Sequence, residues 1–156
     1  MHVHTPITVR YGETDMMGVV YHANYLLYFE DARIDFLDAV GYPYDEYIEQ
    51  AGYMSPIYGL QVQYRSPLRY GEAAFVRTSV AQSLPMRTVY RQQVFRADDA
   101  AGTDEAGEPL LRAGATPLVD GLVTLCVVER DTFRPVSLKR TFPDLHRLYG
   151  EIIEEA

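Results

Sequence analysis

The chain has 156 residues, of which 47% are hydrophobic, and this size suits a single domain, expected over residues 1–156, that needs no disulfide or structural metal. Its formal net charge of −8 opposes non-specific binding to nucleic acid or anionic lipid. No apolar run approaches the roughly 20 residues of a membrane span, and residues 1–6 lack the pattern of a secretion signal, so we expect a cytoplasmic protein.

The first predicted strand covers residues 8–11, where β-favouring side chains precede a turn-rich stretch at 12–15 that Gly18 closes. The residues before this strand are expected to fray. Because they include His2 and His4, a metal site that uses these histidines is weakly supported. The chain is therefore expected to begin with a short strand and a loop.

A long helix is predicted over residues 24–40, because apolar side chains recur there at helical spacing. Asn24 is a candidate N-cap, and Gly41 with Pro43 ends the helix. We expect a central helix that is covered over much of its circumference, because further apolar residues lie outside the main stripe: Leu26, Leu27, Ile34 and Leu37. Residues 44–53 suggest a second, short helix.

Period-two alternation over residues 58–65 predicts a strand with one buried face. Further strands are predicted over residues 73–81, 88–97 and 122–129. The last of these contains Cys126, the only cysteine, which we expect to be a small buried hydrophobe. A strand, a long helix and four more strands predict an α+β fold with an antiparallel sheet packed on one helix.

Two segments fall outside this regular pattern. Residues 98–117 are rich in Ala, Gly, Asp and Pro, which predicts a long exposed hairpin connection or loop. Residues 142–156 predict a C-terminal amphipathic helix.

The densest group of reactive side chains lies in residues 11–25, where the long helix begins. A helix N-terminus presents unpaired N–H groups and a partial positive charge, which suit a carbonyl oxygen that gains negative charge. The carboxylate of Asp15 can approach the same carbonyl from the other side, as a nucleophile or as a base that activates water. From spacing alone, a capping role for Asp15 and a structural role for His22 are the favoured interpretations.

The motif Thr14-Asp15-x-x-Gly18-Val19-Val20-Tyr21-His22-x-x-Tyr25 resembles the signature of the 4-hydroxybenzoyl-CoA thioesterase-like hotdog family. The resemblance extends over roughly residues 5 to 140 and is nearest to the acyl-CoA thioesterase branch associated with the Tol-Pal system. It implies a hotdog fold, in which an antiparallel sheet wraps around a long central helix. It also implies hydrolysis of an acyl-CoA to free acid and coenzyme A.

The resemblance assigns roles to five residues of the motif. Asp15 matches the catalytic aspartate, and His22 matches the position whose backbone N–H polarises the thioester carbonyl, with its imidazole as a further aid. Gly18 permits the tight turn, while Tyr21 and Tyr25 are candidate walls of the substrate pocket.

Three features depart from the family pattern or have a second explanation. Met16 and Met17 replace smaller residues, which leaves the width of the acyl pocket open. Glu30 and Arg33 fit the pattern, but at this spacing they equally form a structural ion pair on one helix. The stretch 101–117 is longer than the usual hairpin, and we favour a loop insertion over a cover for the site.

The resemblance also bears on partners. Coenzyme A carries phosphate oxygens, for which Arg65, Arg69 and Arg91 are candidate ligands. No cofactor is expected beyond the coenzyme A of the substrate, and no metal. The family forms homodimers and homotetramers with sites at the subunit interface.

Two other functions remain as alternatives. One is a hotdog hydratase or dehydratase that acts on enoyl or 3-hydroxyacyl thioesters, although its usual His-Pro pattern is absent. The other is a non-catalytic module that binds acyl thioesters. A serine hydrolase is poorly supported, because the sequence has no G-x-S-x-G motif.

Overall fold

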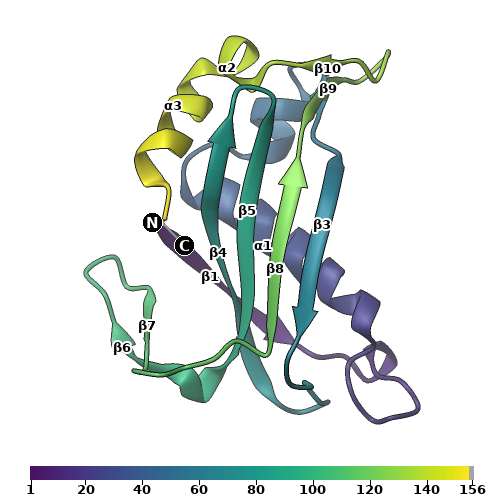
Figure 1. Ribbon diagram of the computed structural model, residues 1–156, viewed down its shortest axis with the longest axis vertical. Coiled ribbons are helices and arrows are strands. Elements are labelled where there is room, and N and C mark those ends of the chain that lie inside the picture. The colour runs from purple at the N-terminus through teal and green to yellow at the C-terminus, as the bar shows by residue number, and fades with distance from the viewer. Residues whose placement is uncertain (155–156) are drawn as a thin grey trace.

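The computed structural model describes residues 1–154, which form a five-stranded antiparallel sheet packed on one long helix (Figure 1). The strand order is β1-β4-β5-β8-β3. The bounds are β1 His2–Thr8, β3 Ile57–Tyr64, β4 Ala73–Leu84, β5 Arg87–Arg96 and β8 Val119–Leu125, and the helix α1 spans Tyr25–Ala39. The expected α+β class, with an antiparallel sheet around a long central helix, is confirmed.

Shorter elements close the two ends of the sheet. They are the 3₁₀ turns Tyr11–Glu13, His22–Asn24 and Ala97–Asp99, the π-helical turn Tyr44–Glu49, the strands β2 Tyr53–Met54, β6 Ala100–Thr103, β7 Pro109–Leu111, β9 Val127–Glu129 and β10 Pro135–Val136, and the helices α2 Leu138–Thr141 and α3 Pro143–Ile152. Strands β10, β9 and β2 form a second, small sheet. None of the helices within residues 1–154 is long and apolar enough to cross a membrane.

The core lies between α1 and the sheet. Phe29, Ala32 and Phe36 of α1 are completely buried. Phe29 sits against Gly121 of β8, where an added Cβ would lie 2.6 Å from Phe29 Cε2. Glycine at this position therefore permits the close approach of helix and strand. The opposite side of α1 is open, so the expectation of a helix covered over much of its circumference is wrong: Leu27 is 55% and Ile34 37% exposed.

Strand β3 is an edge of the main sheet. It pairs with β8, and within the described residues no strand pairs with its other side. Tyr58, Leu60 and Tyr64 are consequently 67%, 41% and 49% exposed. The expected buried face of this strand is therefore wrong for the single chain, because a strand at the edge of a sheet has a neighbouring strand on one side only, and alternation does not indicate that position.

Strand β1 begins earlier than predicted and does not fray. It pairs with β4 from His2, opposite Ser79, to Thr8, opposite Ala73. Its alternate residues Val3, Thr5 and Ile7 are buried on the side of the core. The strand predicted at residues 8–11 was therefore placed too late, because pairing with β4 orders the N-terminal residues.

Residues 98–117 form the expected exposed hairpin connection, since they join the antiparallel partners β5 and β8, but they carry more regular structure than a loop. They contain the hairpin of β6 and β7, which is attached to β1 through Glu108. Glu108 Oε2 accepts a hydrogen bond from the His4 backbone N at 2.9 Å and lies 2.8 Å from His4 Nδ1. Because His4 alternates with the core residues of β1, the hairpin lies on the sheet face away from α1.

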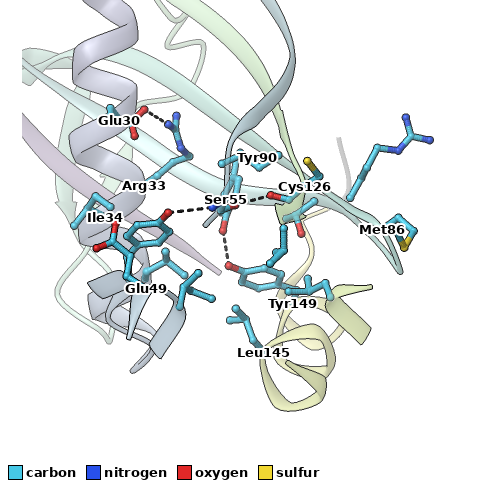
Figure 2. A pocket seen from close by; sticks show the side chains of 18 residues that line it. Glu30, Arg33, Ile34, Glu49, Ser55, Met86, Tyr90, Cys126, Leu145 and Tyr149 are labelled. Carbon is cyan, nitrogen blue, oxygen red and sulfur yellow. Dashed lines mark hydrogen bonds and ion pairs between the residues drawn. The ribbon is translucent and has the colours of Figure 1, made fainter. Parts of the chain in front are cut away.

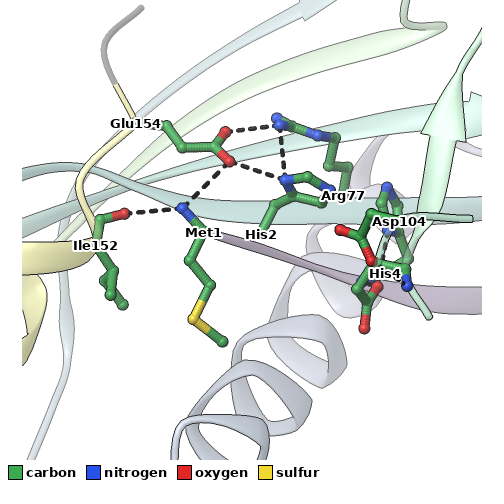
Figure 3. Close-up of polar contacts among 8 residues, drawn as sticks. Met1, His2, His4, Arg77, Asp104, Ile152 and Glu154 are labelled. Atoms are coloured by element: carbon green, nitrogen blue, oxygen red, sulfur yellow. Dashed lines mark hydrogen bonds and ion pairs between the residues drawn. The ribbon is translucent and has the colours of Figure 1, made fainter. Parts of the chain in front are cut away.

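The C-terminal helix α3 ends at Ile152, not at residue 156. Glu154 instead turns toward the sheet, where its backbone N donates to Val80 O at 3.0 Å. Its carboxylate accepts from Arg77 Nη2 at 2.6 Å and lies 2.8 Å from His2 Nδ1 (Figure 3). Residues 155–156 of the predicted helix lie outside the described residues.

The strand predicted over residues 122–129 is two strands. Strand β8 begins at Val119 and ends at Leu125, and β9 continues from Val127 in the small sheet. Cys126 lies at the break, where its backbone N donates to Pro56 O at 3.2 Å. Its side chain is half-buried and not fully enclosed, contrary to expectation.

Candidate active site

Asp15 lies in a closed turn between β1 and α1 (the purple loop at the lower right of Figure 1). The turn is closed at its base by an antiparallel bridge between Thr14 and Val20. Asp15 N donates to Val19 O at 3.0 Å, and Gly18 N donates to Asp15 O at 2.9 Å. Gly18 has a φ of +72°, a left-handed conformation that glycine adopts without strain. Backbone hydrogen bonds therefore fix the position of Asp15.

The carboxylate of Asp15 is half-buried and only partly engaged. Its Oδ1 accepts a hydrogen bond from Met17 N at 2.8 Å, which stabilises the turn. Within residues 1–154, Oδ2 has no protein partner. One carboxylate oxygen thus holds the side chain in place while the other is available to water or substrate.

Glu13 anchors this turn to α1, a role that no sequence motif indicates. Its Oε2 accepts from the Tyr28 hydroxyl at 2.6 Å and from Arg10 N at 2.9 Å. Its carbonyl accepts from Asn24 Nδ2 at 2.8 Å and from Tyr21 N at 2.9 Å. Partial burial raises the pKa of Glu13, but the hydrogen bonds from Tyr28 and Arg10 outweigh it and lower the pKa. The Asn24 side chain therefore stabilises the turn through its hydrogen bond to the Glu13 carbonyl and does not cap α1, contrary to expectation.

The start of the helical segment follows the turn directly. The 3₁₀ turn His22–Asn24 runs into α1, and the backbone N–H groups of His22 and Ala23 have no acceptor within the described residues. The imidazole of His22 is exposed, with its centroid 4.3 Å from that of Tyr21. The carbonyl of His22 accepts from the Tyr64 hydroxyl at 2.9 Å. Two free donors therefore lie close to Asp15 in the chain, at the Tyr64 end of β3.

The two candidate wall tyrosines differ in exposure. Tyr21 is 45% exposed and open to a ligand, whereas Tyr25 is 3% exposed. The Tyr25 hydroxyl accepts from Leu68 N at 3.2 Å, and burial raises its pKa. Tyr25 therefore supports the site from the core, and the substrate contacts assigned to these tyrosines stay predictions.

The structure separates the three candidate arginines. Arg91 binds Asp120 through Nε at 3.3 Å and Nη2 at 3.0 Å, and Arg65 Nη2 lies 3.9 Å from the same carboxylate. Arg69 is exposed and follows Leu68, whose carbonyl accepts from Val20 N at 2.8 Å. Arg69 is therefore held beside the Asp15 turn, while Asp120 engages Arg65 and Arg91.

Glu30 and Arg33 form the structural ion pair that their spacing allows. Arg33 is 4% exposed, and its Nη1 also donates to Gln92 Oε1 at 3.1 Å. Burial of a guanidinium requires such partners. These two residues also line a cavity.

This cavity, of about 240 Å³, lies between α1, from Glu30 to Leu37, the start of β5 and the end of β8. Figure 2 shows the side chains that line it. The π-helical turn at residues 44–49 and the helices α2 and α3 complete its walls. Much of the lining is apolar and includes Ile34, Leu37, Ile48, Leu125, Val127 and Leu145. The sequence did not reveal this cavity, because its walls come from segments that are far apart in the chain.

Polar groups in the cavity wall are mostly paired with one another. Ser55 N donates to the Tyr44 hydroxyl at 3.0 Å, and Ser55 Oγ donates to Cys126 O at 3.0 Å. The hydroxyls of Tyr90 and Tyr149 are hydrogen bonded to each other (Figure 2). Burial raises the pKa of Tyr90 to about 12, so this hydroxyl stays protonated at neutral pH. The cavity wall therefore combines apolar side chains with polar groups that are largely hydrogen bonded to one another.

The Asp15 turn and the cavity lie at opposite ends of β3. Ile57, at one end, pairs with Leu125 of the cavity wall. Tyr64, at the other end, bonds to His22. Seven strand steps of about 3.3 Å separate these ends by about 23 Å.

The histidines are not grouped with other metal-binding side chains. Among residues 1–154, no three His, Cys, Asp or Glu side chains are arranged to hold a metal ion. His146 lies apart from His22, with its Nδ1 3.2 Å from Ser83 Oγ.

Comparisons with known proteins agree on one family. A family model described as "Thioesterase-like superfamily" matches residues 9–110. The protein named "Putative acyl-CoA thioesterase YneP" of Bacillus subtilis is 34% identical over 143 residues, which are 92% of this chain and 91% of that protein. A solved DHNA-CoA thioesterase from Staphylococcus aureus has a TM-score of 0.79 and 35% identity, and the match covers 96% of this chain and 89% of that one.

A more distant solved structure shares the fold. A 4-hydroxybenzoyl CoA thioesterase, solved with 4-hydroxybenzoyl CoA, has a TM-score of 0.72 at 16% identity, and the match covers 92% of this chain and 97% of that one. The resemblance seen in the motif around Asp15 is thereby confirmed at the level of the family. The narrower Tol-Pal-associated branch stays a prediction.

Proposed function

Because the chain belongs to the Thioesterase-like superfamily, with its hotdog fold, we propose that it hydrolyses acyl-CoA thioesters to free acid and coenzyme A. The names of its relatives support this reaction class. The observation that carries the proposal is the arrangement around Asp15: a fixed carboxylate with one free oxygen is followed, within the same hydrogen-bonded turn and the helical start after it, by two unpaired N–H donors.

This arrangement suits the chemistry of a thioester. The carbonyl oxygen accepts from the N–H groups of His22 and Ala23, which stabilise the negative charge that develops as the carbonyl is attacked. The free oxygen of Asp15 acts on the opposite side. It either attacks the carbonyl carbon and forms an anhydride that water hydrolyses, or it takes a proton from the attacking water. In both routes the coenzyme A thiolate leaves.

We propose that the working unit is a dimer in which β3 pairs with β3 of a second copy. Within one chain, the Asp15 turn adjoins the Tyr64 end of β3 and the cavity adjoins the Ile57 end, and these two ends of the strand are about 23 Å apart. Antiparallel pairing of β3 with its own copy places the Tyr64 end of one strand opposite the Ile57 end of the other. Each cavity then lies beside Asp15 of the partner subunit. Further pairing to a tetramer stays a prediction.

Arg69 is the proposed contact for the phosphates of coenzyme A. Its guanidinium is exposed beside the Asp15 turn and has no partner within the described residues, whereas Asp120 engages Arg65 and Arg91. An arginine with free donors binds phosphate oxygens strongly. No cofactor beyond the coenzyme A of the substrate is needed for this reaction.

The test is free-thiol release from short, long and aromatic acyl-CoAs by the purified protein. Hydrolysis predicts stoichiometric release of thiol and free acid from at least one of them. Hydration of an enoyl-CoA without release of thiol would favour the hydratase alternative. Binding of acyl-CoAs without any product would favour the non-catalytic module.

A further inference from the structure

The tip of the Asp15 turn carries two exposed methionines. The side chain of Met16 is fully exposed and that of Met17 is 79% exposed, although the backbone of the turn is fixed by hydrogen bonds. Two further exposed aromatic side chains flank this turn in the sequence and in the loop that pairs with Val20: Tyr11 is 78% and Tyr70 62% exposed, with ring centroids 5.7 Å apart. Adjacent exposed apolar side chains on an ordered loop indicate a contact surface.

A second apolar surface lies at the other end of β3, at the mouth of the cavity. Ile57 is 47%, Tyr58 67% and Met86 44% exposed. Arg87, which lines the cavity, lies with its Cζ 5.5 Å from the centroid of the Tyr58 ring. Antiparallel pairing of β3 with β3 of a second copy brings this surface opposite the methionine tip of the partner, because each occupies the opposite end of the strand.

From this juxtaposition, and resting on the proposed function, we propose that Met16 and Met17 of each subunit close the mouth of the partner subunit's cavity and set the length of acyl chain that it accepts. The cavity of about 240 Å³ takes the acyl group of the thioester. The unbranched methionine side chains adapt to irregular apolar surfaces and so can form a movable wall. Chain-length selection is therefore assigned to residues of one subunit and a cavity of the other.

The first test uses alkyl-CoA thioethers, from butyl to hexadecyl, which bind without turnover. Calorimetry with the parent predicts an affinity that rises about fourfold per methylene and then stops rising once the cavity is full. The chain length at which the affinity stops rising is the chain-length limit. A Met16→Ala/Met17→Ala variant removes three heavy atoms from each side chain, so this chain-length limit moves about six carbons toward longer chains. The control Leu110→Ala removes an exposed apolar side chain from the β6–β7 hairpin and leaves the limit unchanged.

The second test uses Cys126, the only cysteine of the chain, which lines the cavity. In a Met16→Cys variant, a short bismaleimide is expected to join the new thiol to Cys126 of the partner subunit, which gives a covalent dimer on a denaturing gel. The parent and a Leu110→Cys variant give monomer. The dimer band must disappear in Met16→Cys/Cys126→Ser, since that change removes one of the two joined thiols.

The outcomes separate this inference from the proposed function. An unchanged chain-length limit in the double methionine variant overturns the inference, and so does the absence of the Cys126-dependent dimer, even if the parent hydrolyses acyl-CoAs. If the limit moves and the dimer forms while the parent releases no thiol from any acyl-CoA, the proposed hydrolysis fails and the assignment of the methionines to the cavity stands.

Discussion

A mixed dimer tests whether Asp15 acts on a substrate held by the other subunit. Two inactive variants are needed. Asp15→Asn removes the carboxylate charge, and Cys126→Phe fills the cavity, which has a volume of about 240 Å³. In a mixed dimer, Asp15 of the Cys126→Phe subunit faces the intact cavity of the Asp15→Asn subunit, so one of the two sites is complete.

The size of the recovered activity follows from the symmetry. Random reassembly of equal amounts makes about half of the dimers mixed, and each mixed dimer has one of two sites intact, so about one quarter of the parent activity returns. The assay is thiol release after the two variants are unfolded and refolded together. Asp15→Asn mixed with Asp15→Asn/Cys126→Phe is the matched control, because it forms mixed dimers that contain no complete site.

A contrary result is equally clear. If Asp15 served the cavity of its own chain, the mixture would show no more activity than the two variants measured apart. That outcome would refute the pairing of β3 across subunits, which is inferred from the separation of about 23 Å between the two ends of the strand.

Two further predictions concern the frame that positions the site. Gly121→Ala would place Cβ 2.6 Å from the buried ring of Phe29 and should lower the free energy of unfolding by about 1–3 kcal/mol, measured by urea denaturation. Gly59→Ala, whose added Cβ would lie 3.8 Å from Thr124 Cβ, should cost less than about 1 kcal/mol, and equal losses in the two variants would contradict the packing argument. Burial of Glu154 opposes its ionisation, but hydrogen bonds from His2 and Arg77 outweigh this effect and lower its pKa from 4.5 to about 2. The ionised carboxylate therefore stabilises the folded state above pH 4.5, and this stabilisation is lost as the pH falls toward 2. Thermal denaturation at pH 7 and pH 3 should therefore show a larger loss for the parent than for Glu154→Gln, and the same loss in both would refute this linkage.

The elements that were predicted well are those whose sequence signal is local. The long helix was expected at residues 24–40 and spans Tyr25–Ala39, because periodic apolar residues and the following Gly41 mark both its face and its end. The turn around Asp15 was also expected, since Gly18 permits the left-handed backbone that closes it. Local chemistry of this kind can be read from a few neighbouring residues.

The features that were missed depend on contacts between distant segments. A hairpin connection was among the expectations for residues 98–117, but their composition does not reveal the strands β6 and β7 or the contact of Glu108 with His4. Alternation in β3 predicts a strand, yet it does not reveal that the strand is an edge. The cavity is formed by residues as far apart as Arg33 and Leu145, and no spacing in the sequence indicates that they meet.

The measurement that tests the central claim most directly is the rate of thiol release by Asp15→Asn from the best acyl-CoA substrate. The exposed Asp38 of α1 supplies the control Asp38→Asn, and binding of an alkyl-CoA thioether confirms that each variant is folded. Loss of a nucleophile or general base predicts a fall in kcat of at least about a hundredfold for Asp15→Asn, with thioether affinity retained and Asp38→Asn unaffected. A kcat for Asp15→Asn within about threefold of the parent would show that Asp15 is structural and would contradict the mechanism.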